Sequence, residues 1–181
     1  MLMKSAMNIS MEYDGGIALF DPEVFCNYLE SINLIDGNIF ELFIKNKKVG
    51  DRAIADGVII PIYPVDEDDY IFVNLNIENI DCKWEFEYDG FPLRIESGIL
   101  VATDIFSLMS WEHEFFRSYK ENYKKRSRVN DMIDLVPGMY SVGISGGISD
   151  SKKIYGLQFG IVEELPRLGQ AIDSDSFDFN I

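Results

Sequence analysis

The sequence is poor in the residues that disulfide frameworks and metal sites require. It holds 2 cysteines and 1 histidine in 181 residues, so neither a disulfide framework nor a zinc or iron site is expected. Cys26 follows Val24 and Phe25, and Cys82 lies two residues before Trp84, which predicts two reduced, buried thiols. No stretch approaches the ~20 apolar residues of a membrane-spanning helix, and the N-terminus lacks the apolar run of a secretory signal. We therefore expect a soluble, cytoplasmic, bacterial protein with no membrane partner.

Positive charge is also scarce. The chain has 16 lysines and arginines against 31 acidic residues, a net charge of −15. Such a surface repels polyanions at long range, so direct binding of nucleic acid is not expected. Six basic residues gather in a short segment with two tyrosines among them: Arg117, Lys120, Lys124, Lys125, Arg126 and Arg128. In this negative field we expect that segment to contact acidic residues of its own chain.

The remaining composition predicts a packed fold. Apolar residues make up 47% of the chain and aromatic residues 13%, which is typical of a globular domain and not of a disordered one. Short runs of β-branched and aromatic residues, such as 39–44, 70–77 and 83–88, alternate with Asp-Gly pairs that favour hairpin turns. Met139 to Ser145 is expected to pair with Ile154 to Val162 across a Gly146-Gly147 loop.

Two helices are expected. Asp21, Pro22 and Glu23 form a helix start, with a capping aspartate, a proline in the first position and an acid in the first turn. A second apolar stripe begins near Asp104 and fits one long helix or two shorter helices broken near Ser110. We predict an α+β fold of mainly antiparallel β-structure, a sandwich or curved sheet of nine or ten strands with two helices packed on it. We predict a single domain over residues 1–165, followed by an acidic, partly flexible tail over residues 166–181.

No catalytic, cofactor or metal motif is convincing. Residues 143–147 match G-x-S-x-G, but the sequence after them predicts a loop and a strand, whereas a hydrolase nucleophile precedes a helix. His113, between two glutamates, is interpreted as a solvated surface residue. Consecutive carboxylates at 66–69 cannot all converge on one cation from an extended backbone. The C-terminal aspartates lack the glycine and glutamate of a calcium loop, so no cofactor is predicted.

The acidic surplus itself is the strongest functional signal. Residues 1–44 hold seven acids and one base, and residues 64–96 hold ten acids and two bases. If strands from these blocks share a face, the resulting negative patch would attract a basic partner and accelerate its association. Aromatic residues near the acids would supply anchors. The predicted partner-binding residues are Asp66, Glu67, Asp68, Asp69, Trp84, Glu85, Glu87 and Asp89.

One stretch of the C-terminal half resembles a known group of proteins. Pro137-Gly138-Met139-Tyr140-Ser141-Val142, followed by Tyr155-Gly156-Leu157-Gln158-Phe159, is similar to the strand–turn–strand pattern of small β-rich bacterial immunity proteins and competence-associated nuclease inhibitors. This resemblance implies an inhibitor that occludes a nuclease or another toxin. It covers roughly fifty of the 181 residues and carries over no binding residue.

Three functions therefore stay open. The first is a non-enzymatic acidic protein, an immunity protein or inhibitor that binds a basic toxin or nuclease. The second is a β-sandwich enzyme or small-ligand binder, with a pocket lined by Trp84 and Trp111 and carboxylates as acid and base. The third is a structural or assembly component of a phage or secretion apparatus, whose alternating Phe177, Phe179 and Ile181 would add a strand to a neighbour.

Overall fold

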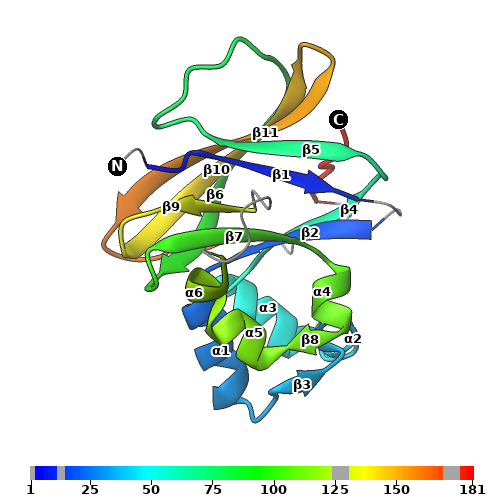
Figure 1. Ribbon diagram of the computed structural model, residues 1–181, viewed down its shortest axis with the longest axis vertical. Helices are drawn as coiled ribbons and strands as arrows, with labels where there is room; N and C mark the ends of the chain where they lie inside the picture. Colours follow the sequence, from blue (N-terminus) through cyan, green and yellow to red (C-terminus); the bar gives the residue numbers. More distant parts are fainter. Residues whose placement is uncertain (1–2, 12–14, 124–130, 169–175) are drawn as a thin grey trace.

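Two large β-sheets, a small two-stranded sheet and a layer of helices build this protein in the computed structural model, which describes residues 3–11, 15–123, 131–168 and 176–181 (Figure 1). The described strands are β1 (Ala6–Ser10), β2 (Gly15–Phe20), β3 (Asp36–Gly37), β4 (Ile60–Val65), β5 (Asp69–Asn74), β6 (Lys83–Ile95), β7 (Ile99–Asp104), β8 (Trp111–Glu112), β9 (Met132–Asp134), β10 (Gly138–Ser149) and β11 (Lys152–Val162). The described helices are α1 (Pro22–Ser31), α2 (Ile39–Lys45), α3 (Lys47–Ala55), α4 (Phe106–Met109), α5 (His113–Arg117) and α6 (Tyr119–Tyr123). No described helix is long and apolar enough to cross a membrane.

The two larger sheets lie face to face (Figure 1). A five-stranded sheet has the order β1-β5-β11-β10-β6, and a four-stranded sheet has the order β4-β2-β7-β9. Their strand pairs are antiparallel, apart from the parallel pair of β5 and β11. The four-stranded sheet is covered on both faces. Successive residues of β2 therefore alternate between two cores, with Leu19 packed between the sheets and Phe20 packed under the helices.

The α+β class and the mainly antiparallel sheets agree with the prediction, but the predicted counts were wrong. The described residues form eleven strands and six helices, where nine or ten strands and two helices were expected. Residues 39–44, predicted as a strand, form most of α2. The Asn38 side chain accepts the N–H of Glu41 at 2.8 Å and starts this helix. Gly50 of α3 then lets the two helices meet, since a Cβ there would lie 2.9 Å from the Phe43 carbonyl oxygen.

Two predicted turns also lie elsewhere. β10 and β11 pair from Met139↔Val162 to Ser149↔Lys152, so the predicted partners are right, but Gly146 and Gly147 lie inside β10. The hairpin turns at Asp150 and Ser151, whose φ angles are 48° and 63°, as a two-residue hairpin turn requires. Asp89-Gly90 likewise makes no hairpin. It forms a bulge within β6, with Gly90 at φ 85°.

The last described residues belong to the core between the sheets. Phe177 and Phe179 are buried there, and the Tyr155 hydroxyl donates to the Phe179 carbonyl at 2.7 Å. Their rings pack on the side chains of Phe86 and Tyr88 from β6, with ring centroids 6.1 Å apart for Phe86–Phe179 and 5.1 Å for Tyr88–Phe177. These two phenylalanines therefore pack within their own chain. The assembly hypothesis needs a free aromatic tail, so their burial argues against it. The division at residue 165 stays a prediction, because residues 169–175 lie outside the described ones.

Candidate functional site

The first half of β6 carries a row of acidic side chains along one edge of the five-stranded sheet. Glu85, Glu87 and Asp89 are all exposed, while Phe86 and Tyr88 between them turn inward and are half-buried. We call Glu85, Glu87 and Asp89 the acidic strip. No ion pair joins the strip to a basic residue of the described ranges. Its three side chains therefore face the solvent without a basic partner among the described residues.

Small residues on the neighbouring strand leave the acidic strip open. Glu87 pairs with Ser145 of β10, and the bulge at residues 89 and 90 lies opposite Gly143. A Cβ added to Gly143 would lie 2.6 Å from the Asp89 carboxylate, so the aspartate occupies the space that a side chain at position 143 would take. The strip therefore has no long neighbouring side chain on β10 to screen it.

The outer edge of β6 beside the strip is unpaired. β6 pairs with β10 on one side, and within the described ranges no backbone hydrogen bond reaches residues 83–89 from the other side. An edge of this kind has free backbone donors and acceptors, which either receive a strand from a partner or need charges to prevent such pairing.

Trp84, predicted as a partner anchor, has a contact within the chain. A second bulge, with Glu85 as the extra residue, places Trp84 opposite Gly147. Its ring covers Gly156 together with Leu75, since a Cβ at Gly156 would lie 2.8 Å from Trp84 and 2.6 Å from Leu75. Trp84 is half-buried in this position.

The acidic run 66–69 comprises the connection from β4 to β5 and the first residue of β5, Asp69, and all four side chains are exposed. Asp68 pairs with Lys153 at 3.0 Å, and the hydrogen bond from Lys153 lowers the pKa of Asp68 below its usual value. Asp69 accepts the Ser10 hydroxyl at 2.5 Å, and the N–H of Asp66 donates to the Asn180 side chain at 3.1 Å. Glu67 also has a contact within the chain. This run therefore ties together the turn, β1, β11 and the chain end.

The structure does not merge the two acidic groups into one patch. Tyr70, Lys153, Ile148 and Lys83 stand in one row across β5, β11, β10 and β6. Three strand spacings separate the ends of this row, about 14 Å. Of the residues in this row, Lys153 on β11 lies between β5, which begins in the acidic run, and β6, which carries the acidic strip. Of the predicted residues, the strip is the part that faces solvent without an ion-pair partner in the part of the chain that the structure describes.

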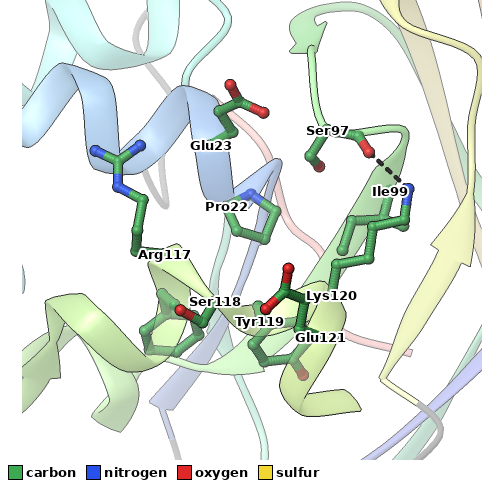
Figure 2. Close-up of a pocket in the computed structure, with 10 residues that line it drawn as sticks. Pro22, Glu23, Ser97, Ile99, Arg117, Ser118, Tyr119, Lys120 and Glu121 are labelled. Carbon is green, nitrogen blue, oxygen red and sulfur yellow. Dashed lines mark hydrogen bonds between the residues drawn. The ribbon is translucent and has the colours of Figure 1, made fainter. Parts of the chain in front are cut away.

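The described part of the basic segment is also engaged within the chain. Arg117 and Lys120 line a cavity at the start of α1 whose volume is about 380 Å³. Figure 2 shows both side chains there together with Glu23 and Glu121. Lys120 donates to the Ser97 carbonyl at 2.9 Å, and Arg117 donates to the Asn27 side chain at 2.8 Å and pairs with Glu30. The other members, Lys124, Lys125, Arg126 and Arg128, lie outside the described residues, as do Asp173 and Asp175.

His113 corrects the prediction of a solvated surface residue, because it is buried with 7% exposure. Its Nδ1 accepts the Trp111 Nε1–H at 3.3 Å, and its Nε2 lies 2.9 Å from Glu30. Helix α5 begins at His113 directly after β8, so the flanking glutamates point outward while the imidazole points inward. Hydrogen bonds from His113 and then Arg117 lower the pKa of Glu30.

Ser145, the serine of the G-x-S-x-G match, does not have the setting of a hydrolase nucleophile. Ser145 lies within β10, paired with Gly156, and not at a strand-to-helix turn. Cys26 donates to the backbone carbonyl of His113 at 3.9 Å, not to its ring. Within the described ranges, no group of three or more histidine, cysteine or acidic side chains is arranged to hold a metal ion.

The two thiols should differ in reactivity. Burial raises the pKa of Cys26 to about 12 and also raises that of Cys82, which is half-buried. Because only the thiolate reacts, we expect iodoacetamide at pH 8 to label Cys82 slowly and to leave Cys26 unlabelled until the protein is denatured. Peptide mass spectrometry before and after addition of urea measures this. Rapid labelling of Cys26 in the native protein would contradict the buried environment described above.

Comparison with known proteins gives little further guidance. No protein-family model matches the chain, and no curated protein matches it. The chain is similar to a crystal structure of ComJ from Bacillus subtilis, described as an inhibitor of the DNA-degrading activity of NucA, with 15% sequence identity and a TM-score of 0.46. The match covers 90% of this chain and 100% of ComJ. At this level of similarity the function has to be inferred from the site.

Proposed function

We propose that this protein is a non-enzymatic binding protein whose acidic strip contacts a basic partner, and that it inhibits a nuclease or toxin by covering its cationic surface. The observation that carries this proposal is the strip itself. Glu85, Glu87 and Asp89 are exposed in a row, have no ion pair to a described basic residue, and stand on an unpaired strand edge.

The charge distribution suits a cationic target. A nuclease needs a basic groove to attract phosphates, and a row of carboxylates competes for the same groove. The two-residue repeat of a strand places successive side chains of one face about 7 Å apart. The net charge of −15 adds long-range attraction, which raises the association rate most at low ionic strength.

The fold holds the strip in a fixed shape before any partner arrives. The second half of β6 is anchored in the core between the sheets through Phe91, Leu93 and Ile95. Behind the strip, Phe86 and Tyr88 stack at 4.9 Å and pack on the chain end. A preorganised strand loses little conformational entropy on binding, which favours affinity.

A capture experiment tests the proposal. The wild type, a strip variant (Glu85→Gln, Glu87→Gln, Asp89→Asn) and a matched variant (Asp36→Asn, Glu112→Gln, Glu114→Gln) are immobilised and exposed to extract from the cells that produce the protein. The matched acids are exposed and lie at the β3–β8 end, so both variants lose the same charge. We expect a basic protein to bind the wild type and the matched variant and to be released by moderate salt. Its nuclease or toxic activity should fall when the wild type is added.

The strip variant should capture about tenfold less of that protein, since each rim charge contributes on the order of 0.5 kcal/mol. Equal capture by all three proteins, or capture that salt does not change, would contradict the proposal. If instead the strip variant self-associates and no basic protein binds the wild type, the charges serve only to protect the edge of β6.

A further inference from the structure

We propose that an apolar pocket on the helix side of the fold binds a free medium-chain fatty acid or a similar apolar carboxylate. This site is separate from the acidic strip, and it does not depend on the function proposed above. The pocket is a cavity of about 450 Å³ between α2, α3, α4 and β4. This volume lies within the range of roughly 300–1,000 Å³ that is typical of small-molecule sites.

The walls of the pocket fit a hydrocarbon chain. Phe40, Phe43 and Ile44 of α2 form one side, Leu108 of α4 lies on another, and Tyr63 of β4 lies against Phe40 with ring centroids 5.4 Å apart. Ile44 is 57% exposed and Tyr63 is 37% exposed. Burying large apolar side chains away from water is favourable, so both residues would gain from being covered. An apolar ligand entering the pocket would cover both side chains.

One basic side chain at the mouth can bind the carboxylate of a ligand. Lys47 lines the pocket, and neither Lys47 nor Lys48 makes an ion pair within the described ranges. The other two basic residues of α2 and α3 are paired, Lys45 with Glu41 and Arg52 with Asp56. Lys47 is also the first residue of α3, whose cap makes no side-chain hydrogen bond and whose first turn has no acid. Because α2 ends at Lys45 and shares the cap Asn46 with α3, its negative end offsets the positive end of α3, and the Lys47 side chain itself supplies the positive charge at the mouth.

Asp51 is the one opposing charge in the lining, one turn after Lys47. No ion pair joins it to Lys47 or to another described basic residue. Asp51 would weaken the binding of a ligand carboxylate at Lys47, whereas Lys47 would weaken the binding of a cationic ligand at Asp51. Removing the charge of Lys47 should therefore weaken the binding of an anionic ligand and strengthen that of a cationic one. Removing the charge of Asp51 should do the opposite, so the two substitutions together report the sign of the ligand charge.

Calorimetric titration with three probes of equal chain length tests the site: decanoate, decanol and decyltrimethylammonium, each below its micelle-forming concentration. We expect decanoate to bind at one saturable site. Decanol and decyltrimethylammonium should bind about fivefold more weakly, which is the difference that one exposed ion pair can produce. No saturable binding of decanoate, or equal binding of all three probes, would overturn the proposal.

Variants locate the contact. Lys47→Met should weaken decanoate binding about fivefold and Asp51→Asn should strengthen it about twofold, whereas Lys48→Met, the matched control outside the lining, should leave it unchanged. Ile44→Gln should also weaken binding, because it removes apolar contact at an exposed position. Thermal unfolding of each variant checks that the fold is intact. Equal effects of Lys47→Met and Lys48→Met, or tighter binding of the cationic probe, would overturn the assignment.

Discussion

Replacing Asp21 with alanine is expected to lower the free energy of unfolding by about 4 kcal/mol, because a buried carboxylate with five hydrogen bonds is lost. Asp21 has no exposed surface. One carboxylate oxygen accepts the N–H groups of Glu23 at 2.7 Å and Val24 at 3.1 Å and so caps α1. The other oxygen accepts the N–H groups of Glu96 and Ser97, both at 2.7 Å, and the Ser97 hydroxyl at 2.9 Å. One side chain therefore joins the helix layer to the β6–β7 turn.

Urea unfolding followed by circular dichroism measures this effect. Ser97→Ala is the matched control, since it removes a single hydrogen bond to the same oxygen and should cost about 1 kcal/mol. Asp21→Asn keeps the helix cap but turns its amide NH₂ group toward the N–H donors of Glu96 and Ser97. Its loss of unfolding free energy should therefore lie between those of Ser97→Ala and Asp21→Ala. A loss below 1 kcal/mol in Asp21→Ala would mean that the five contacts do not hold the layers together.

Reversing the charges of the acidic strip should have the largest effect on binding. In Glu85→Lys, Glu87→Lys, Asp89→Lys, attraction becomes repulsion at three adjacent exposed positions. We expect the affinity for the captured basic partner to fall by about 100-fold, with most of the change in the association rate. The stability should change little, because exposed substitutions typically cost about 0.5 kcal/mol or less.

The matched reversal Asp36→Lys, Glu112→Lys, Glu114→Lys separates contact from net charge. These side chains are exposed near His113 on the far layer, and the total charge changes by the same amount. We expect a fall of about threefold, from weaker long-range attraction alone. Surface plasmon resonance gives both rates. If the two reversals weakened binding equally, the strip would not be the contact surface.

Local chemistry predicted some elements because their signals were sufficient in themselves. Asp21, Pro22 and Glu23 start α1 as expected, and the chain does break after α4, at Ser110. The alternation of polar and aromatic residues in 83–88 correctly indicated a strand with one wet face. These features depend on neighbours in the sequence, which is why periodicity and capping rules find them.

Other elements depend on contacts that are distant in the sequence. Ile39 to Ile44 has the composition of a strand, yet it forms a helix whose rings pack on Phe25 of α1 and Tyr63 of β4. An Asp-Gly pair suits a hairpin turn and a bulge equally well. Because β6 pairs with β10 both before and after Asp89-Gly90, this pair forms a bulge. The burial of His113 required knowledge of where Trp111 and Glu30 would lie.

The candidate site was predicted in part for the same reason. The sequence located the acids of β6, but not that this strand would be an edge, nor that its neighbours at Gly143 and Ser145 would leave them open. It gave equal weight to residues 66–69, whose ties to Lys153, Ser10 and Asn180 come from three different parts of the chain. The apolar pocket was not predicted, since its walls include the helix that was read as a strand.

The most direct test is the dissociation constant of the purified basic partner at several salt concentrations, measured for the wild type and the two neutralised variants. If the acidic strip is the contact surface, the affinity of the wild type and the matched variant should fall steeply with salt. The strip variant should bind more weakly at low salt and depend less on salt. The same salt dependence and affinity in all three proteins would contradict binding through Glu85, Glu87 and Asp89.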